Sequence, residues 1–170
     1  MTSKKRIDLV RGIVNEVLEK QTDKIHANCG YIHLYGVSAL CHQLALSRSL
    51  DPELAMIIAM LHDIYTYRTK ISKLHAHNGA KDALIILKKL NVFTEEEQQI
   101  ITNAIYHHSS KSEINDSYDE LLKDADTLQY YLHNPNRACT LARFNRLNSI
   151  FKELGLNTEV LSNCKIVEKM

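Results

Sequence analysis

Apolar residues recur along most of the chain at the spacing of a helix that is packed on one side. The first such stretch covers about residues 6–20, and its apolar stripe consists of Ile7, Val10, Ile13, Val14, Val17 and Leu18. β-branched residues seldom alternate with polar ones, as they would in a half-buried strand. Only five glycines and two prolines interrupt the pattern. The sequence therefore predicts an all-α fold.

Periodicity and capping residues together mark about seven helices. After the first, the predicted helices cover roughly residues 33–49, 52–64, 75–90, 94–108, 117–133 and 134–155, and a weaker helical pattern follows in the tail. Asp51 precedes a proline at the first helical position, which is a favoured helix start. Thr94 with Glu97, and Ser117 with Glu120, have the spacing of capping boxes.

The segment PELAMIIAMLHDI, residues 52–64, is apolar almost all round and predicts the central buried helix. His62 and Asp63 interrupt it near its end. A histidine bonded to a backbone carbonyl and an aspartate that caps the next segment would explain the pair without any function. A buried carboxylate is costly unless it is compensated, however, and a metal ion compensates it well. The functional hypothesis is therefore a metal site at this helix end.

Other histidines also lie in apolar surroundings. His33 begins the apolar face of the second predicted helix, although a histidine at a helix N-terminus can lack any role. His108 points to the core at the end of the fifth, whereas His107 lies at the edge of its apolar arc. His75 and His77 both lie near the start of the fourth. The pattern alone does not choose between the last two.

Asp124 and Asp126 compete for the inner face of the sixth predicted helix. Periodicity places Asp124 nearer to the apolar stripe, which consists of Leu121, Leu128 and Leu132. Asp126 is nearer to Tyr130 and His133, on a more polar face. Two aspartates on one helix most often form a solvated face. If one of them is functional, helix periodicity favours Asp124.

Composition narrows the class of protein. The 170 residues suit one domain, and 45% hydrophobic with 24% charged residues allow a real core. The net charge of +1 gives no basic footprint for a nucleic acid partner. Neither a secretory leader nor an apolar run of about 20 residues is present, so we expect a cytoplasmic protein without a membrane partner. The four cysteines lie far apart and predict reduced, mostly buried thiols rather than a zinc knuckle.

Taken together, these residues resemble a known pattern. His33, the pair His62-Asp63 and the segment KDADTL are similar to the H…HD…D signature of the HD-domain superfamily of metal-dependent phosphohydrolases, over roughly residues 25–135. HAHNGA and AIYHHS resemble segments of a subgroup with additional histidines, and they select His75 and His108.

The resemblance also indicates which aspartate would bind the metal, and the chain departs from the family pattern at one position. It places the metal-ligating aspartate after the alanine, at Asp126, against the periodicity argument, and makes Asp124 a candidate for supporting a ligand. Many members carry an arginine three residues after the first histidine, where this chain has Gly36. That departure puts phosphate contacts from the second helix in doubt.

The resemblance implies a single HD-like bundle over residues 1–170 that hydrolyses a phosphate ester of a nucleotide or other small metabolite. A divalent ion (Mn, Fe, Co, Ni or Zn) would activate the water. The implied metal ligands are His33, His62, Asp63 and Asp126. Asp63 would also be catalytic, through proton transfer.

The roles of the remaining residues stay open. His75 and His108 would hold a second metal or the substrate phosphate. Candidate phosphate contacts, chosen because they are close in sequence to ligands, are Arg68, Lys70 and Lys111. The alternatives to a hydrolase are a di-iron oxygenase of HD-like fold and a non-enzymatic module that binds metal or nucleotide.

Overall fold

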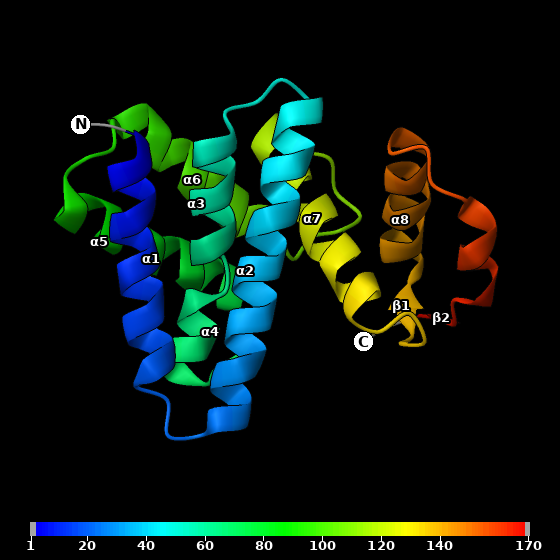
Figure 1. Cartoon of the computed structure of the whole chain (residues 1–170), viewed down its shortest axis with the longest axis horizontal. Helices are drawn as coiled ribbons and strands as arrows, with labels where there is room; N and C mark the ends of the chain where they lie inside the picture. The colour runs from blue at the N-terminus through cyan, green and yellow to red at the C-terminus, as the bar shows by residue number, and fades with distance from the viewer. Residues whose placement is uncertain (1–2, 169–170) are drawn as a thin grey trace.

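The computed structural model describes residues 3–168, which form a helical bundle (Figure 1). Its helices are α1 (Ser3–Glu19), α2 (Lys24–Ser47), α3 (Pro52–Leu61), α4 (Ile64–Thr69), α5 (His75–Leu90), α6 (Glu95–His107), α7 (Ser117–His133) and α8 (Leu141–Glu153). The strands β1 (Cys139–Thr140) and β2 (Ile166–Val167) pair in parallel, and the 3-10 helix η1 (Thr158–Asn163) precedes β2. The predicted all-α class is confirmed.

Helix α3 lies at the centre of the bundle, as its sequence predicts. Its side chains from Ala55 to Leu61 are fully buried, except for Met56, and it packs against α1, α2, α6 and α7. Asp51 caps it by accepting hydrogen bonds from the backbone N–H groups of Glu53 and Leu54. The core around α3 therefore fixes the position of whatever follows its C-terminal end.

Helix α2 begins nine residues earlier than the prediction, at Lys24 rather than His33. Asp23 caps it and accepts hydrogen bonds from the backbone of Ile25 and His26. Gly30 lies inside this first part because a Cβ there would come within 2.4 Å of the Leu18 side chain. The glycine thus permits close packing of helices instead of ending one. His33 consequently lies in the middle of α2, not at its start.

Of the two predicted capping boxes, one is confirmed and one is wrong. Thr94 and Glu97 do form a capping box for α6, but α7 has Asp116 at its N-cap and no side-chain cap bond. The carboxylate of Glu120 bonds instead to the backbone N–H of Asn115 and to the buried Lys123. A buried ammonium group is a stronger partner for Glu120 than a helix N-terminus.

The last long helix begins at Leu141 rather than at Asn134. Asn134 has extended backbone angles, as expected for a residue that precedes proline, and residues 134–138 form a turn. Thr140 then caps α8. The weaker helical pattern of the tail corresponds to the short η1 and to β2.

The C-terminal part has its own small core, which lies beside the main bundle (Figure 1). It joins Leu128 of α7 to α8 and η1 through Leu147, Ile150, Phe151 and Leu161. The β1–β2 pair closes this layer. Helix α7 is therefore packed on two sides, by the main bundle and by α8.

Two further expectations concern the membrane and the thiols. Among residues 3–168 no helix combines the length and hydropathy that a membrane span needs. All four cysteines are unpaired. Cys41 and Cys139 are buried, but Cys29 is exposed and Cys164 is partly exposed, so the expected burial holds for two of them.

Candidate metal centre

His62 and Asp63 lie at the break between α3 and α4. His62 is the C-cap of α3, and Asp63 has non-helical backbone angles before α4 starts. The break allows both side chains to turn toward one place, although neighbours on a continuous helix would point about 100° apart. The His62 ring is fully buried, and its Nδ1 donates a hydrogen bond to the carbonyl of Ala59 at 2.7 Å.

Three further histidines repeat this arrangement. Nδ1 of His75 and Nδ1 of His108 donate to the carbonyls of Ser72 and Ile105 at 2.9 and 2.6 Å. Nδ1 of His33 donates to the Gln129 side-chain oxygen at 2.9 Å. Carbonyl oxygens only accept hydrogen bonds, so the proton of each neutral ring is on Nδ1. Each Nε2 consequently presents a lone pair.

These lone pairs face one another in two pairs. Nε2 of His33 is 3.1 Å from Nε2 of His62, and Nε2 of His75 is 3.1 Å from Nε2 of His108. Two unprotonated nitrogens cannot hydrogen-bond to each other and repel at this distance. A cation between them removes the repulsion, and adjacent ligands of one ion with bonds of about 2.1 Å lie about 3 Å apart. The nitrogens thus fit metal coordination.

Asp63 lies between the two histidine pairs. Its Oδ2 is 3.5 Å from Nε2 of His33 and 3.6 Å from that of His62. Its Oδ1 is 3.6 Å from Nε2 of His75 and 3.5 Å from that of His108. Oδ1 is also buried without a hydrogen-bond partner. Each carboxylate oxygen of Asp63 therefore faces one pair of nitrogens, so the residue can bridge two ions.

Asp126 approaches the first histidine pair from α7. Its Oδ1 lies 3.7 Å from Nε2 of His33, and its Oδ2 accepts a 2.6 Å hydrogen bond from Lys111. Burial alone would raise the pKa of Asp126, but Lys111, His33 and Arg143 hold it well below its usual range. Burial, together with Arg143 and Arg146, lowers the pKa of Lys111 more than Asp126 raises it. Asp126 is thus a carboxylate at neutral pH.

Electrostatics keeps Asp63 and Asp126 ionised and the His62 ring neutral near pH 7. Burial lowers the pKa of His62 to about 4, so this ring is neutral near pH 7. Burial also lowers the pKa of His33, but Asp63 and Asp126 outweigh it and the net shift is upward. Burial would raise the pKa of Asp63, yet the imidazoles of His62, His108 and His33 hold it well below its usual range. The site attracts positive charge.

The structure explains why position 36 is a glycine. A Cβ at Gly36 would come within 3.1 Å of the Gln129 side chain. Gln129 occupies that space and its amide oxygen holds the His33 ring. The chain thus has a neutral side chain from α7 beside the position where the resemblance implies an arginine. Gln129 was not among the site residues predicted from the sequence.

Several predicted residues lie elsewhere. Asp124 accepts hydrogen bonds from Arg48 and Arg146 at 2.8 Å, on a different face of α7 from Asp126. Positions two apart on a helix differ by about 200° in direction. Arg68 pairs with the side chain of Asp82. Arg68 and Lys70 line a separate cavity beside α1 and α5. Of the three proposed phosphate contacts, Lys111 alone lines the cavity at the histidines.

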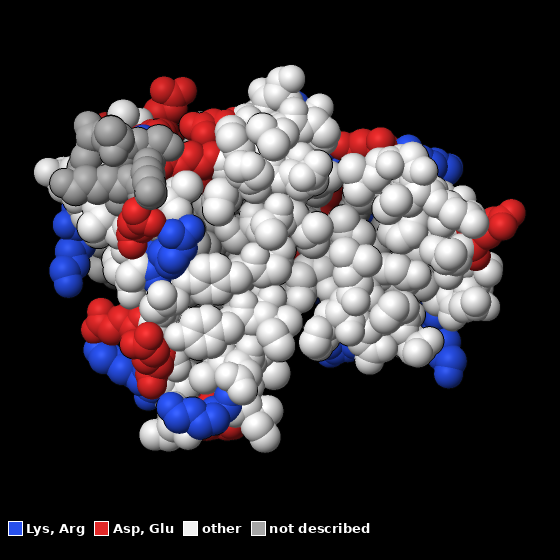
Figure 2. Space-filling model, viewed as in Figure 1, with Lys and Arg blue, Asp and Glu red and all other residues white. Residues whose placement is uncertain are grey.

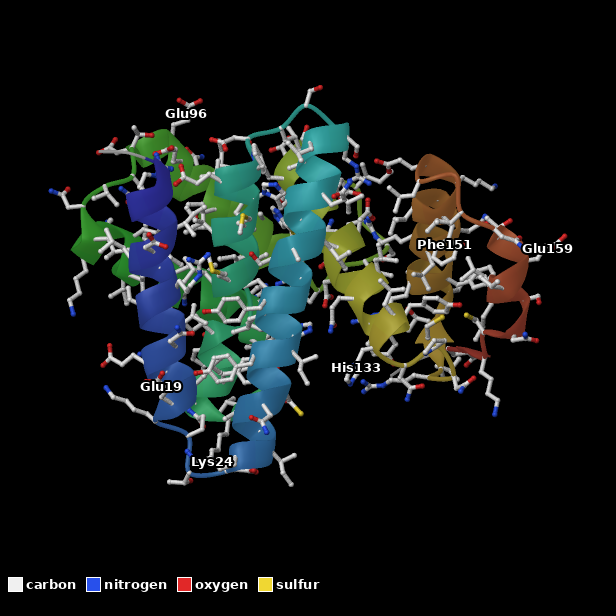
Figure 3. The ribbon with its side chains drawn as sticks, viewed as in Figure 1. Glu19, Lys24, Glu96, His133, Phe151 and Glu159 are labelled. Atoms are coloured by element: carbon white, nitrogen blue, oxygen red, sulfur yellow. The ribbon has the colours of Figure 1, made fainter. Side chains whose placement is uncertain are left out.

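Two histidines that the resemblance did not select, His77 and His107, have other partners. His107 bonds to Asp119 at 2.6 Å, and His77 stacks on the ring of Tyr106 with centroids 4.2 Å apart. His133 lies at the end of α7 (Figure 3) and lines the cavity at the histidines.

A cavity of about 370 Å³ opens onto the cluster. Lys111 and Asp126 form part of its wall, together with residues that sequence reasoning missed: Cys29, Ile32, Tyr67, Gln129, Tyr130, Arg137 and Arg143. Arg137 and Arg143 follow α7 in a segment that carries no motif, and only the packing of α8 brings them here.

Figure 2 shows that one broad face of the molecule over α2 is nearly free of lysine, arginine and acidic side chains.

The family follows from this geometry together with the comparisons. The model of the HD domain family matches residues 30–131, more than half of the chain. The chain therefore belongs to the HD-domain family, which confirms the resemblance.

One solved structure shares its fold. This crystal structure is described as that of a predicted HD superfamily hydrolase from an uncultured Thermotogales bacterium. It is 21% identical, has a TM-score of 0.57, and the match covers 89% of this chain and 88% of that chain. No match was found among curated proteins.

Proposed function

We propose that this protein is a metal-dependent phosphohydrolase that acts on a nucleotide or another small phosphorylated metabolite. The fold neighbour described as a predicted hydrolase is consistent with that class. The observation that carries the proposal is the pair of Nε2–Nε2 contacts at 3.1 Å, with one oxygen of Asp63 facing each pair.

The donor set narrows the metal. Four neutral imidazoles and two carboxylates suit borderline divalent ions such as Mn²⁺, Fe²⁺, Co²⁺, Ni²⁺ or Zn²⁺ better than Ca²⁺. His33, His62, Asp63 and Asp126 would hold one ion, and Asp63, His75 and His108 a second. When bound, the metal supplies an activated water and a Lewis acid for the phosphoryl oxygen.

The side chains of the centre divide the remaining work. Asp63 stays ionised at neutral pH, so a carboxylate oxygen can accept a proton of the attacking water and orient it. Lys111 lies beside Asp126 and places positive charge at the wall of the cavity, where charge develops on the phosphoryl oxygens. The hydrogen bonds on Nδ1 keep all four rings in the orientation that this chemistry needs.

The charge of the cavity favours an anionic substrate. Its lining has two carboxylates, Asp63 and Asp126, which the metal would neutralise, and three cationic side chains, Lys111, Arg137 and Arg143. A di-iron oxygenase could use the same nitrogen and oxygen ligands, and the three cations could bind an anionic organic substrate of either enzyme. We prefer hydrolysis of an anionic ester because the resemblance is to phosphohydrolases.

A phosphate-release screen over nucleotides and sugar phosphates, with added Mn²⁺, Co²⁺ or Ni²⁺, tests the proposal. We expect release that requires metal and that is lost in His62→Ala. His77→Ala, whose ring stacks on Tyr106 instead, is the matched control and should keep its activity. Metal binding without any release would favour a non-enzymatic module, and turnover that requires iron and dioxygen would favour the oxygenase.

A further inference from the structure

Two arginines extend the site beyond the segment that matches the HD domain. Arg137 and Arg143 come after residue 131, the last matched position. The guanidinium carbon of each lies 4.5 Å from the centre of the Tyr130 ring, at the end of α7. Arg137 is exposed at the rim, whereas the Arg143 side chain is only 19% exposed. Both line the cavity of the metal centre.

Arg143 reaches the wall of the centre itself. Its Nη2 is 3.8 Å from Oδ2 of Asp126, whose other oxygen faces His33. Its Nη1 is buried and has no hydrogen-bond partner. A buried guanidinium nitrogen without an acceptor is costly, so a ligand that brings an anionic oxygen would relieve that cost.

The C-terminal layer holds Arg143 in this place. Thr140 caps α8 and accepts a hydrogen bond from the backbone N–H of Arg143. Leu147, Ile150 and Phe151 anchor the same helix in the second core. The hydroxyl of Tyr130 donates to the carbonyl of Ala138 at 2.8 Å, which ties α7 to the turn before α8. The guanidinium is thus positioned before any ligand arrives.

We propose that Arg143 binds a peripheral oxygen of the substrate's phosphoryl group and thereby selects phosphate monoesters over diesters. This inference rests on the proposed function. A monoester dianion has three peripheral oxygens, and one of them can face the Arg143 guanidinium while others face the centre. A diester has one negative charge and a second substituent, so it gains less from the guanidinium. Arg137 adds positive charge at the rim.

The test uses full-length protein loaded with Mn²⁺ and titrates inorganic phosphate by calorimetry. Arg143→Gln should weaken phosphate binding about 10- to 100-fold, because it removes a hydrogen bond between charged groups. Bound Mn²⁺, measured by native mass spectrometry, should not change. Arg143→Lys keeps the positive charge but lacks the planar guanidinium group. Its affinity for phosphate should therefore lie between those of wild type and Arg143→Gln. Arg68→Gln, which changes an exposed arginine of another cavity, should bind phosphate like wild type.

A second readout compares p-nitrophenyl phosphate with bis(p-nitrophenyl) phosphate, which share a leaving group. Arg143→Gln should lower kcat/KM for the monoester more than for the diester. Unchanged phosphate affinity in a fully metal-loaded Arg143→Gln, or unchanged selectivity in active protein, overturns the assignment. If phosphate binding depends on Arg143 but no ester is hydrolysed, the assignment stands as a binding site and the proposed hydrolase does not.

Discussion

At the scale of single residues, the centre depends on hydrogen bonds that leave little freedom. Three of the four histidines donate Nδ1–H to a backbone carbonyl three residues earlier, and His33 donates to Gln129. Backbone acceptors of this kind cannot be recognised from residue identity. The sequence could therefore point to His62, Asp63 and their partners by motif, but not to the shared tautomer that makes them fit a metal.

The two aspartates of α7 give a prediction at this scale. Asp126→Asn should abolish phosphate release, because it removes a carboxylate from beside His33. Asp124→Asn should leave bound metal unchanged and reduce activity by at most about 10- to 100-fold, as for a residue that supports ligands indirectly. Its measurable effect should be on stability, since Asp124 pairs with Arg48 and Arg146. Metal analysis, phosphate release and thermal unfolding measure these effects in both variants. Loss of metal from Asp124→Asn would contradict the assignment of Asp126 as the ligand.

At the scale of elements, the apolar patterns predicted which segments form helices, but helix periodicity could not assign the inner face of a helix that is packed on two sides. The apolar stripes of α1, α5 and α6 identified these helices. Helix α7 is packed by the bundle and by α8, and almost all residues from Asp119 to Gln129 are buried. A helical wheel that assumes one inner face therefore favoured Asp124 as the functional aspartate, whereas the motif favoured Asp126. Arg143 was missed because no local pattern marks the packing of α8.

The helix starts provide a matched pair of variants. Thr94→Ala should lower the free energy of unfolding by about 1 kcal/mol, because Thr94 and Glu97 satisfy each other's backbone N–H groups. Ser117→Ala should change it little, because α7 has no side-chain cap bond. Urea unfolding measures both. A larger loss in Ser117→Ala than in Thr94→Ala would show that the capping described here is wrong.

At the scale of the whole molecule, the centre joins segments that are far apart in the chain. The residues that would hold the metal come from α2, the α3–α4 break, α5, the end of α6 and α7, so only the folded chain assembles them. Metal binding is then coupled to folding.

Added Mn²⁺ should raise the melting temperature at pH 7.5, and a chelator should reverse the shift. The shift should shrink as the pH falls below 7, because protons compete with the metal for Nε2. His33 takes up its proton at a higher pH than His62, because the pKa of His33 is raised whereas that of His62 is lowered to about 4. Thermal unfolding with and without Mn²⁺ across this range provides the test. A shift that grows toward acidic pH would argue against imidazole ligands.

The most direct measurement of the central claim is the number of metal ions per chain, determined by native mass spectrometry with Mn²⁺ for wild type, His75→Ala and Asp63→Ala. We expect two ions in wild type. His75→Ala should keep one ion, which His33, His62 and Asp126 would hold together with Asp63. Asp63→Ala should lose both ions, because the carboxylate of Asp63 faces both histidine pairs. Wild-type protein that binds no metal, or Asp63→Ala that still binds two ions, would contradict the account.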